Sequence, residues 1–242
     1  MMNSARQFKR RFRRVANWLT DRVRGLPAVQ PHDLTPDRIA AIVARERPLI
    51  LEIGCNDGQD TVRLLEAMPG ATIHCFEPDP RPIARFKKRL GGDQRVRLHS
   101  IAVGGLNGEF DFHTSGGSKQ GKHEDWDLSG SLRKPKEHLE RHPWVTFDSV
   151  TRVPCMRLDD WCLANAVGSI DFIWMDTQGA EADVIAGGTR ALATTRFIYT
   201  EYSNDELYDG QRPLHGLLEI LPDFEVVSRY PGDVLLKNRR IG

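Results

Sequence analysis

The sequence predicts an α/β domain with a mostly parallel sheet and helices on both of its faces. From residue 48 onward, short apolar runs alternate with segments of helical periodicity, which is typical of consecutive strand–helix–strand units. Several of these runs end in an acidic residue or a glycine-containing turn, as buried parallel strands do where they meet a ligand. At 242 residues, the chain is long enough for one large domain with an appendage.

The elements follow in order along the chain. Thr35 and Pro36 supply an N-cap and a first helical residue, so a helix is expected through about Glu46. The first half then predicts strands at 48–53, 71–76, 95–99 and 109–113, and helices at 58–67 and 80–90. The second half predicts strands at 153–158, 170–176, 196–201, 224–229 and 233–237, and helices at 160–165, into Gly187 and at 213–221. Asp159 is expected to cap the helix at 160–165.

Residues 114–150 interrupt this alternation. Ser115 to Lys122 shows no periodicity, and the following stretch mixes histidines and tryptophans with many charges. A loop this long within a compact domain is usually functional or disordered. Its aromatic residues favour a substrate lid.

The N-terminus predicts a basic amphipathic helix. Phe8, Phe12, Val15, Leu19 and Val23 share one helical face, with arginines around the rest. Residues 1–25 have a net charge of +7, whereas the remaining chain has −6. Such a helix can dock on its own domain, or it can bind a partner or an anionic membrane surface. The docking role and the binding role both remain open. We therefore divide the chain into residues 1–34, the helix and a linker, and residues 35–242, the main domain.

Composition excludes several classes of protein. No stretch approaches the roughly 20 apolar residues of a membrane span, and the N-terminus lacks the apolar core of a secretory signal. We expect a cytoplasmic protein, with peripheral membrane contact through residues 1–25 as one option. The four cysteines form no C-x-x-C pair, and the scattered histidines and acids match no metal signature, so no metal site is predicted.

The most informative motif predicts a nucleoside-binding turn. Glu52, Gly54 and Gly58 form E-x-G-x-x-x-G after an apolar run, and Glu77 ends the next predicted strand. A carboxylate before the turn would repel a pyrophosphate but suits the ammonium group of S-adenosylmethionine (SAM). An acid at the second strand end can accept hydrogen bonds from ribose hydroxyls. An ordinary strand–helix turn is the simpler alternative for this pattern.

Two more acids fall at predicted strand ends. Asp176 and Glu201 join Glu52 and Glu77, and the carboxyl ends of parallel strands meet at one edge of a sheet. Buried acids are costly unless they meet a ligand or a partner, so four together predict a site. Any one of them alone could be a helix cap or a member of an ion pair.

These motifs resemble those of the FkbM-type methyltransferase family. The resemblance covers about residues 48–237 and includes EIGCNDG, FEPDP, SIAVGGLNGEFDF and RLDDW. Its most specific blocks are D-x-x-G-x-E at Asp176 to Glu181 and the later E-Y…L-Y-x-G-Q from Glu201 to Gln211. The family often has lysine two residues before that aspartate and glutamate two residues after it, whereas this chain has Trp174 and Gln178.

The resemblance implies a Rossmann-like sheet of seven strands, the last antiparallel, with SAM over the first two strand ends. It places Gly54, Asn56 and Gly58 beside the methionine part and Glu77 on the ribose. Ser100, Ile101 and Ala102 would border the adenine. Substitution of Gly54 by valine is expected to abolish SAM binding while leaving the fold largely intact, since a branched side chain would fill the cofactor's space.

The implied reaction is O-methylation of a hydroxyl of a sugar, glycolipid or other secondary metabolite. Asp176 lies nearest the reacting methyl by this analogy and is the first candidate for a positioning or basic group, followed by Glu201 and then His142. N-methylation, RNA methylation and an inactive SAM-fold binding module remain alternatives. The net acidic body of the chain disfavours nucleic acid as a partner.

Overall fold

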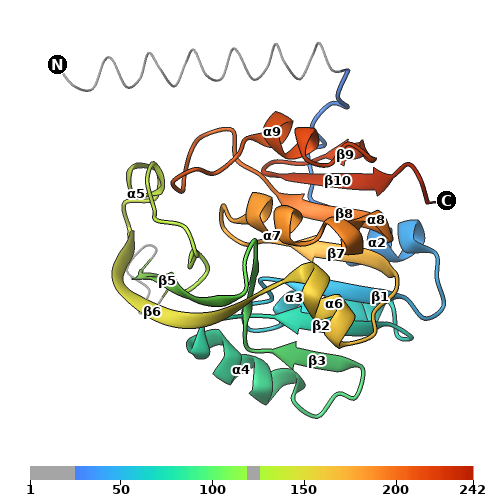
Figure 1. The fold of residues 1–242 in the computed structure, drawn as a ribbon, viewed down its shortest axis with the longest axis horizontal. Helices are drawn as coiled ribbons and strands as arrows, with labels where there is room; N and C mark the ends of the chain where they lie inside the picture. Colours follow the sequence, from blue (N-terminus) through green and yellow to red (C-terminus); the bar gives the residue numbers. More distant parts are fainter. Residues whose placement is uncertain (1–24, 119–125, 242) are drawn as a thin grey trace.

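A seven-stranded sheet forms the centre of the molecule in the computed structural model, which describes residues 25–118 and 126–241 (Figure 1). Its strand order is β3-β2-β1-β7-β8-β10-β9. β10 pairs antiparallel with both of its neighbours, and the other pairings are parallel, which confirms the predicted sheet. The strands are β1 (Leu49–Ile53), β2 (Thr72–Phe76), β3 (Val96–His99), β7 (Ile170–Met175), β8 (Thr195–Glu201), β9 (Phe224–Arg229) and β10 (Asp233–Asn238).

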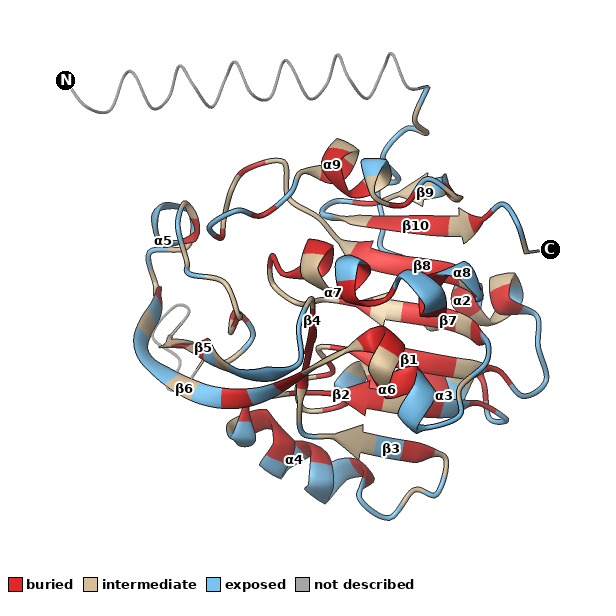
Figure 2. Ribbon diagram, in the orientation of Figure 1, coloured by how far each residue is buried: buried red, intermediate tan, exposed pale blue. Residues whose placement is uncertain are grey.

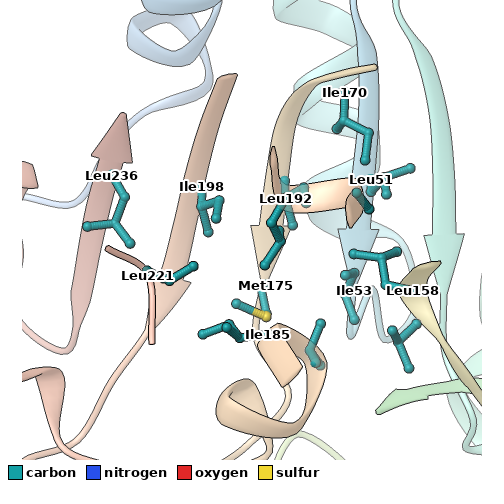
Figure 3. Packing of buried hydrophobic residues seen from close by; sticks show 14 of the residues in the cluster. Leu51, Ile53, Leu158, Ile170, Met175, Ile185, Leu192, Ile198, Leu221 and Leu236 are labelled. Carbon is teal, nitrogen blue, oxygen red and sulfur yellow. The ribbon is translucent and has the colours of Figure 1, made fainter. Parts of the chain in front are cut away.

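Helices cover both faces of this sheet because its strands are apolar on both sides. Residues of α2 (Pro36–Val43), α3 (Gln59–Ala67) and α4 (Pro80–Leu90) share one buried cluster with alternate strand residues. Residues of α6 (Leu158–Ala164), α7 (Glu181–Gly187), α8 (Thr189–Ala193) and α9 (Leu214–Glu219) belong to the cluster on the opposite face. In Figure 3, Ile53 and Met175 of neighbouring strands lie close to Leu158 and Ile185 of the covering helices. Figure 2 shows the burial concentrated in the central strands.

Local capping explains where several helices begin. The Thr35 side chain accepts a hydrogen bond from the Arg38 amide, which confirms the predicted cap of α2. The predicted cap of α6 is wrong, because β6 continues to Arg157 and helix α6 already begins at Leu158. Asp159 therefore lies in the first turn of α6, and its carboxylate accepts hydrogen bonds from the amides of Arg190 and Ala191 in α8.

The expectation of an irregular segment at 114–150 is wrong at both of its ends, which belong to strands. A second sheet has the order β4-β6-β5 and is built from β4 (Ala102–Gly104), β5 (Gly108–Gly117) and β6 (Val145–Arg157). The short helix α5 (His138–Arg141) lies between β5 and β6. A bulge between Thr114 and Gly116 lets β5 continue through the glycine-rich stretch that suggested a loop. Residues 108–118 and 126–157 together are named the wing.

The wing extends past the carboxyl ends of β7 and β8 in Figure 1 and is fixed to the segment that follows β8. The amides of Lys136 and His138 both donate to the carbonyl of Leu207, at 2.7 and 3.1 Å. Arg141 forms an ion pair with Asp205. Main-chain bonds of this kind hold the wing in place independently of side-chain charge.

The predicted N-terminal helix lies outside the described residues. The first described residues, expected to form a linker, instead pair with the sheet edge. The Gln30 amide donates to the carbonyl of Arg229 in β9 at 2.7 Å, and Leu34 is buried. Among the described helices, none combines the length and apolar character needed to cross a membrane.

Candidate functional site

The carboxyl edge of the sheet carries a row of acidic side chains. Ile53 is in register with Phe76 of β2 and with Met175 of β7. One residue further along each strand therefore come Gly54, Glu77 and Asp176. Glu201 follows on β8, since Met175 is in register with Thr200. Three of the four predicted acids thus end neighbouring strands in one row, with a glycine in its middle.

Gly54 is required by the close approach of two backbones. Its φ is +91°, and a Cβ atom built there would lie 1.8 Å from the carbonyl oxygen of Asp176. The Asp176 amide also donates to the Ile53 carbonyl at 2.9 Å, which holds the two strand ends together. A larger residue would therefore displace the end of β7 itself. This corrects the expectation that a valine at Gly54 would leave the fold largely intact.

Glu77 is positioned by the backbone of neighbouring turns. Its carboxylate accepts from the amide of Asp79 at 2.8 Å and from the amide of Asn56 at 3.0 Å. Burial raises the pKa of Glu77 to about 8, and these backbone donors act in the opposite direction. The side chain is 6% exposed, and the remaining lone pairs of its oxygens can still accept hydrogen bonds.

A largely apolar pocket opens beside Glu77. It encloses about 400 Å³, including the part open to solvent. Four residues predicted to bind the cofactor line it: Gly54, Glu77, Ile101 and Ala102. Phe112 and Leu132 of the wing cover it. An apolar pocket with one convergent acid suits a nucleoside, whose base is flat and whose ribose carries hydroxyl groups.

The other predicted cofactor residues lie away from the pocket lining. Glu52 is 3% exposed and accepts a hydrogen bond from the Thr61 hydroxyl at 2.5 Å, and burial raises its pKa to about 8. Gly58 begins α3, where a Cβ atom would lie 2.7 Å from the Phe86 ring. The Asn56 side-chain amide points to Asp127, and Ser100 is exposed.

Asp176 and Glu201 form a pair of interacting carboxyl groups. Both are partly buried, and each affects the ionisation of the other. Burial raises the pKa of Asp176, while the hydrogen bond from Glu201 acts in the opposite direction. Burial, followed by the charge of Asp176, raises the pKa of Glu201 well above its usual range.

Gln178 connects this pair to the wing, and sequence reasoning gave it no role. Its side-chain amide donates to Asp176 at 2.7 Å and to Glu201 at 2.9 Å. Its amide oxygen accepts from the Tyr208 hydroxyl at 2.9 Å. Both residues stand in the motif blocks quoted above, but their meeting depends on the path of the chain after β8. The only signal in the sequence was that Gln178 replaces a frequent glutamate.

The turn that carries Gln178 is organised by Glu181. One oxygen of this buried carboxylate accepts from the amides of Thr177 and Gly179, each at 3.1 Å. Gln178 has a φ of +52°, which is uncommon for a residue with a side chain. The D-x-x-G-x-E block is thus a self-capped turn that aims the Gln178 side chain at the acids.

Trp174 lies on the same face of β7 as Asp176, two residues earlier. It packs edge-on against Tyr199 of β8, with ring centroids 5.1 Å apart. The two departures from the family pattern are complementary, since a lysine and a glutamate are both replaced by uncharged residues. The net charge beside the carboxyl pair is therefore the same as with the more frequent pair of residues.

His142 ends α5 in the wing, where its ring contacts those of His138 and Trp144. His138 in turn contacts the Tyr208 ring, at 5.3 Å between centroids. The His138 ring thus lies between His142 and Tyr208. Asp176 and Glu201, in contrast, interact directly with each other. No cluster of three or more potential metal-ligating side chains occurs among residues 25–118 and 126–241.

The sheet order, the reversed β10 and a nucleoside-sized pocket at the carboxyl edge define the class of methyltransferases with an α/β sheet. The Methyltransferase FkbM domain matches residues 52–230. The chain is also 51% identical over 208 residues to 2-O-methyltransferase NoeI of Sinorhizobium fredii (strain NBRC 101917 / NGR234), covering 84% of this chain and 85% of that protein. The chain belongs to the FkbM methyltransferase family, and it is a methyltransferase.

A solved structure of the same family supports the fold. The crystal structure of methyltransferase FkbM from Methylobacillus flagellatus KT superposes with a TM-score of 0.52 at 15% sequence identity. The match covers 79% of this chain and 44% of that one, so this chain spans less than half of that protein.

Proposed function

We propose that this protein transfers a methyl group from SAM to a hydroxyl group of a sugar-containing acceptor. The observation that carries the proposal is the row at the carboxyl edge. There, a nucleoside-sized pocket with a buried acid lies beside Asp176, and only Gly54 separates the two. The same row thus offers a place for the cofactor and a base for the acceptor.

The pocket fits the nucleoside part of SAM. Glu77 would accept hydrogen bonds from the ribose hydroxyls, since its carboxylate is fixed by backbone amides and the residue lines the pocket. Ile101 and Ala102 would contact the adenine. When bound, SAM supplies a methyl group on a positively charged sulfur that is already activated for transfer.

The protein's part in the reaction is alignment, exclusion of water and removal of one proton. Positioning two reactants can supply roughly 7–11 kcal/mol of the barrier. The acceptor hydroxyl loses its proton to the carboxylate of Asp176 while its oxygen forms the new bond to carbon. Bound SAM would supply the methyl group, and its sulfur would keep the electron pair of the carbon–sulfur bond and so lose its positive charge.

The acceptor assignment is supported by the relative named above. NoeI is a 2-O-methyltransferase by name, and at 51% identity we extend transfer to a 2-hydroxyl group to this chain. The wing adds aromatic surface: Trp126 and Trp144 pack edge to face at 4.6 Å, and both are partly exposed. Partly exposed aromatic side chains suit a sugar, which has apolar faces and a rim of hydroxyl groups.

Two measurements test the proposal. Titration calorimetry with SAM and with its demethylated product should show binding at micromolar concentrations, and absence of binding would leave an inactive fold. Transfer of labelled methyl groups should then be compared among a neutral oligosaccharide, an RNA and an amine. Label found on a ring hydroxyl of the oligosaccharide supports O-methylation, whereas label on nitrogen or on RNA contradicts it.

A further inference from the structure

Gln178 is the only described side chain for which hydrogen bonds to both Asp176 and Glu201 have been identified. One amide nitrogen carries two hydrogens, and here each points to a different carboxyl group. An amide can occupy this place without adding charge, whereas a third carboxyl group would repel the pair. The geometry therefore restricts both carboxyl groups with one neutral group.

The orientation of this amide is set from the wing side. The single proton of the Tyr208 hydroxyl is shared between two acceptors, the Gln178 side-chain oxygen at 2.9 Å and the Ser129 carbonyl at 2.8 Å. Tyr208 is 1% exposed and packs against Gly179, so its hydroxyl has little freedom. An amide oxygen held by a donor must direct its nitrogen to the other side, which is where the acids lie.

The backbone of Gln178 is held just as firmly. The Ser131 hydroxyl donates to the Gln178 carbonyl at 2.8 Å, which ties this turn to the wing. A positive φ at a residue with a side chain persists only where the surroundings impose it. Such residues cluster at functional sites.

We propose that Gln178 is a positioning residue that clamps Asp176 and Glu201 through one amide, so that the pair presents a single base to the acceptor hydroxyl. This inference rests on the proposed function for the identity of the acceptor. The clamp itself is a property of the protein without ligands. The amide donates to one oxygen of each group, at 2.7 Å to Asp176 and at 2.9 Å to Glu201, and in this proposal Asp176 is the ionised member.

The other charged groups that face the pair are acidic. Asp60 of α3, Glu181 of α7 and Asp233 of β10 each act on at least one member of the pair. Tyr208, from the segment after β8, is uncharged at neutral pH because burial raises its pKa beyond the usual range. Additional negative charge at position 178 would therefore add to an existing repulsion.

The first test is Gln178→Glu, with Gln94→Glu on the exposed turn before β3 as the matched control. We expect kcat of Q178E to fall by about tenfold or more at neutral pH, with SAM affinity changed by less than about threefold. The acidic limb of its pH–kcat profile should move to higher pH, because the third carboxyl group makes Asp176 harder to ionise. A profile that coincides with that of Q94E would overturn the clamp.

Tyr208→Phe provides a test without a change of charge. Removal of the hydroxyl leaves the Gln178 oxygen without its donor, so the amide is free to turn. We expect a smaller fall in kcat, about threefold, a shift of the acidic limb in the same direction, and unchanged SAM affinity. A loss that appears only in the melting temperature would show that Tyr208 is merely structural and would count against the clamp.

A third measurement separates the clamp from the proposed function. In the ligand-free protein at neutral pH, the infrared difference spectrum against the wild type should show the loss of one protonated-carboxyl band in Glu201→Gln and the shift of the same band in Gln178→Met, while the bands of Glu52 and Glu77 cancel because they are common to all three proteins. If no hydroxyl acceptor is methylated but this shift is seen, the proposed function fails and the clamp stands. If the acceptor is methylated normally and the band is unchanged in Q178M, the clamp is wrong.

Discussion

Glu77 and Asp176 occupy equivalent places at the ends of β2 and β7, yet they are held by different kinds of groups. Both oxygens of Glu77 are bound by backbone amides of residues 56 and 79, which belong to the turns around it. Asp176 is held by the side chains of Gln178 and Glu201. The Glu77 side of the row is thus fixed by the backbone, whereas the Asp176 side depends on the side chains of Gln178 and Glu201.

This difference explains why the two halves should respond differently to substitution. Substitutions on the Glu77 side should leave the backbone donors around Glu77 in place, because those donors do not depend on side chains. Their effect should therefore be limited to the affinity for the cofactor. Changes on the Asp176 side should alter turnover and its pH dependence, because a network of side chains sets the protonation of the pair. Five substitutions test this division.

Asp176→Asn should have the largest effect. We expect turnover to fall by about 10²- to 10⁴-fold, the usual contribution of a general base, with SAM affinity nearly unchanged. Glu201→Gln should cost much less, because an amide can replace a protonated carboxyl group as a donor to Asp176. Steady-state kinetics and calorimetry on both variants check this. Intact turnover with poor SAM binding in D176N would reassign Asp176 to the cofactor.

Gly54→Ala should affect both halves at once. The added Cβ atom meets the Asp176 carbonyl, so we expect the free energy of unfolding to fall by about 3 kcal/mol or more. Gly92→Ala is the matched control, since a Cβ atom there has open space around it and no positive φ is involved. Urea unfolding of both variants measures the difference. Equal stabilities would mean that β1 and β7 can separate at this point.

Glu77→Gln should weaken SAM binding by about 1.5–3 kcal/mol at pH 9, where Glu77 is ionised, which is the value of hydrogen bonds to a charged group. The exposed Glu109→Gln provides a control of equal charge change. Calorimetry should show the loss with SAM but not with an analogue that lacks the ribose hydroxyls. If the wild-type protein binds SAM and that analogue equally well, Glu77 does not hold the ribose.

Glu52→Gln should have the smallest effect on the site and a clear effect on stability. Burial raises the folded-state pKa of Glu52 to about 8. The contribution of Glu52 to the free energy of unfolding is therefore fully present below the pKa that Glu52 has in the unfolded chain, and it is lost as the pH rises through 8. The free energy of unfolding of the variant should therefore exceed that of the wild type by about 1–2 kcal/mol at pH 9, and the two should be equal near pH 4. Thermal unfolding across this range measures it. Weaker SAM binding in the variant would return Glu52 to the cofactor site.

The same contrast shows how far the site was predictable from sequence. Gly54 and Glu77 were identified because their signals are local: an apolar run, a turn and an acid at a strand end. Asp176 and Glu201 were identified because parallel strands end at one edge. Whether an acid faces a pocket or the core depends on the packing of distant segments and cannot be predicted from neighbouring residues. Glu52, for example, turns toward Thr61 of α3 instead of the pocket. The Gln178–Tyr208 contact joins residues 30 positions apart and follows no periodicity.

The fold was predictable where periodicity was regular. All seven strands of the main sheet were expected, as was the reversal of the last one through the family resemblance. The wing was not expected as a sheet, because its glycines and mixed charges hide the alternation, and β4 has only three residues. Helix α8 was also missed, since Gly187 and Gly188 suggested an end and the cap from Asp159 is distant in sequence.

The length of β6 has a consequence for motion. This strand of 13 residues pairs with β5 along the wing, pairs with β4 at its last three residues and then continues directly into the buried helix α6. An arm that is continuous with the core and tied at its tip to Leu207 cannot swing without breaking sheet bonds. Its amide protons should therefore exchange with solvent only when the whole domain opens, as one cooperative unit. Substrates would then pass beside a stationary wall, and turnover would not wait on its movement.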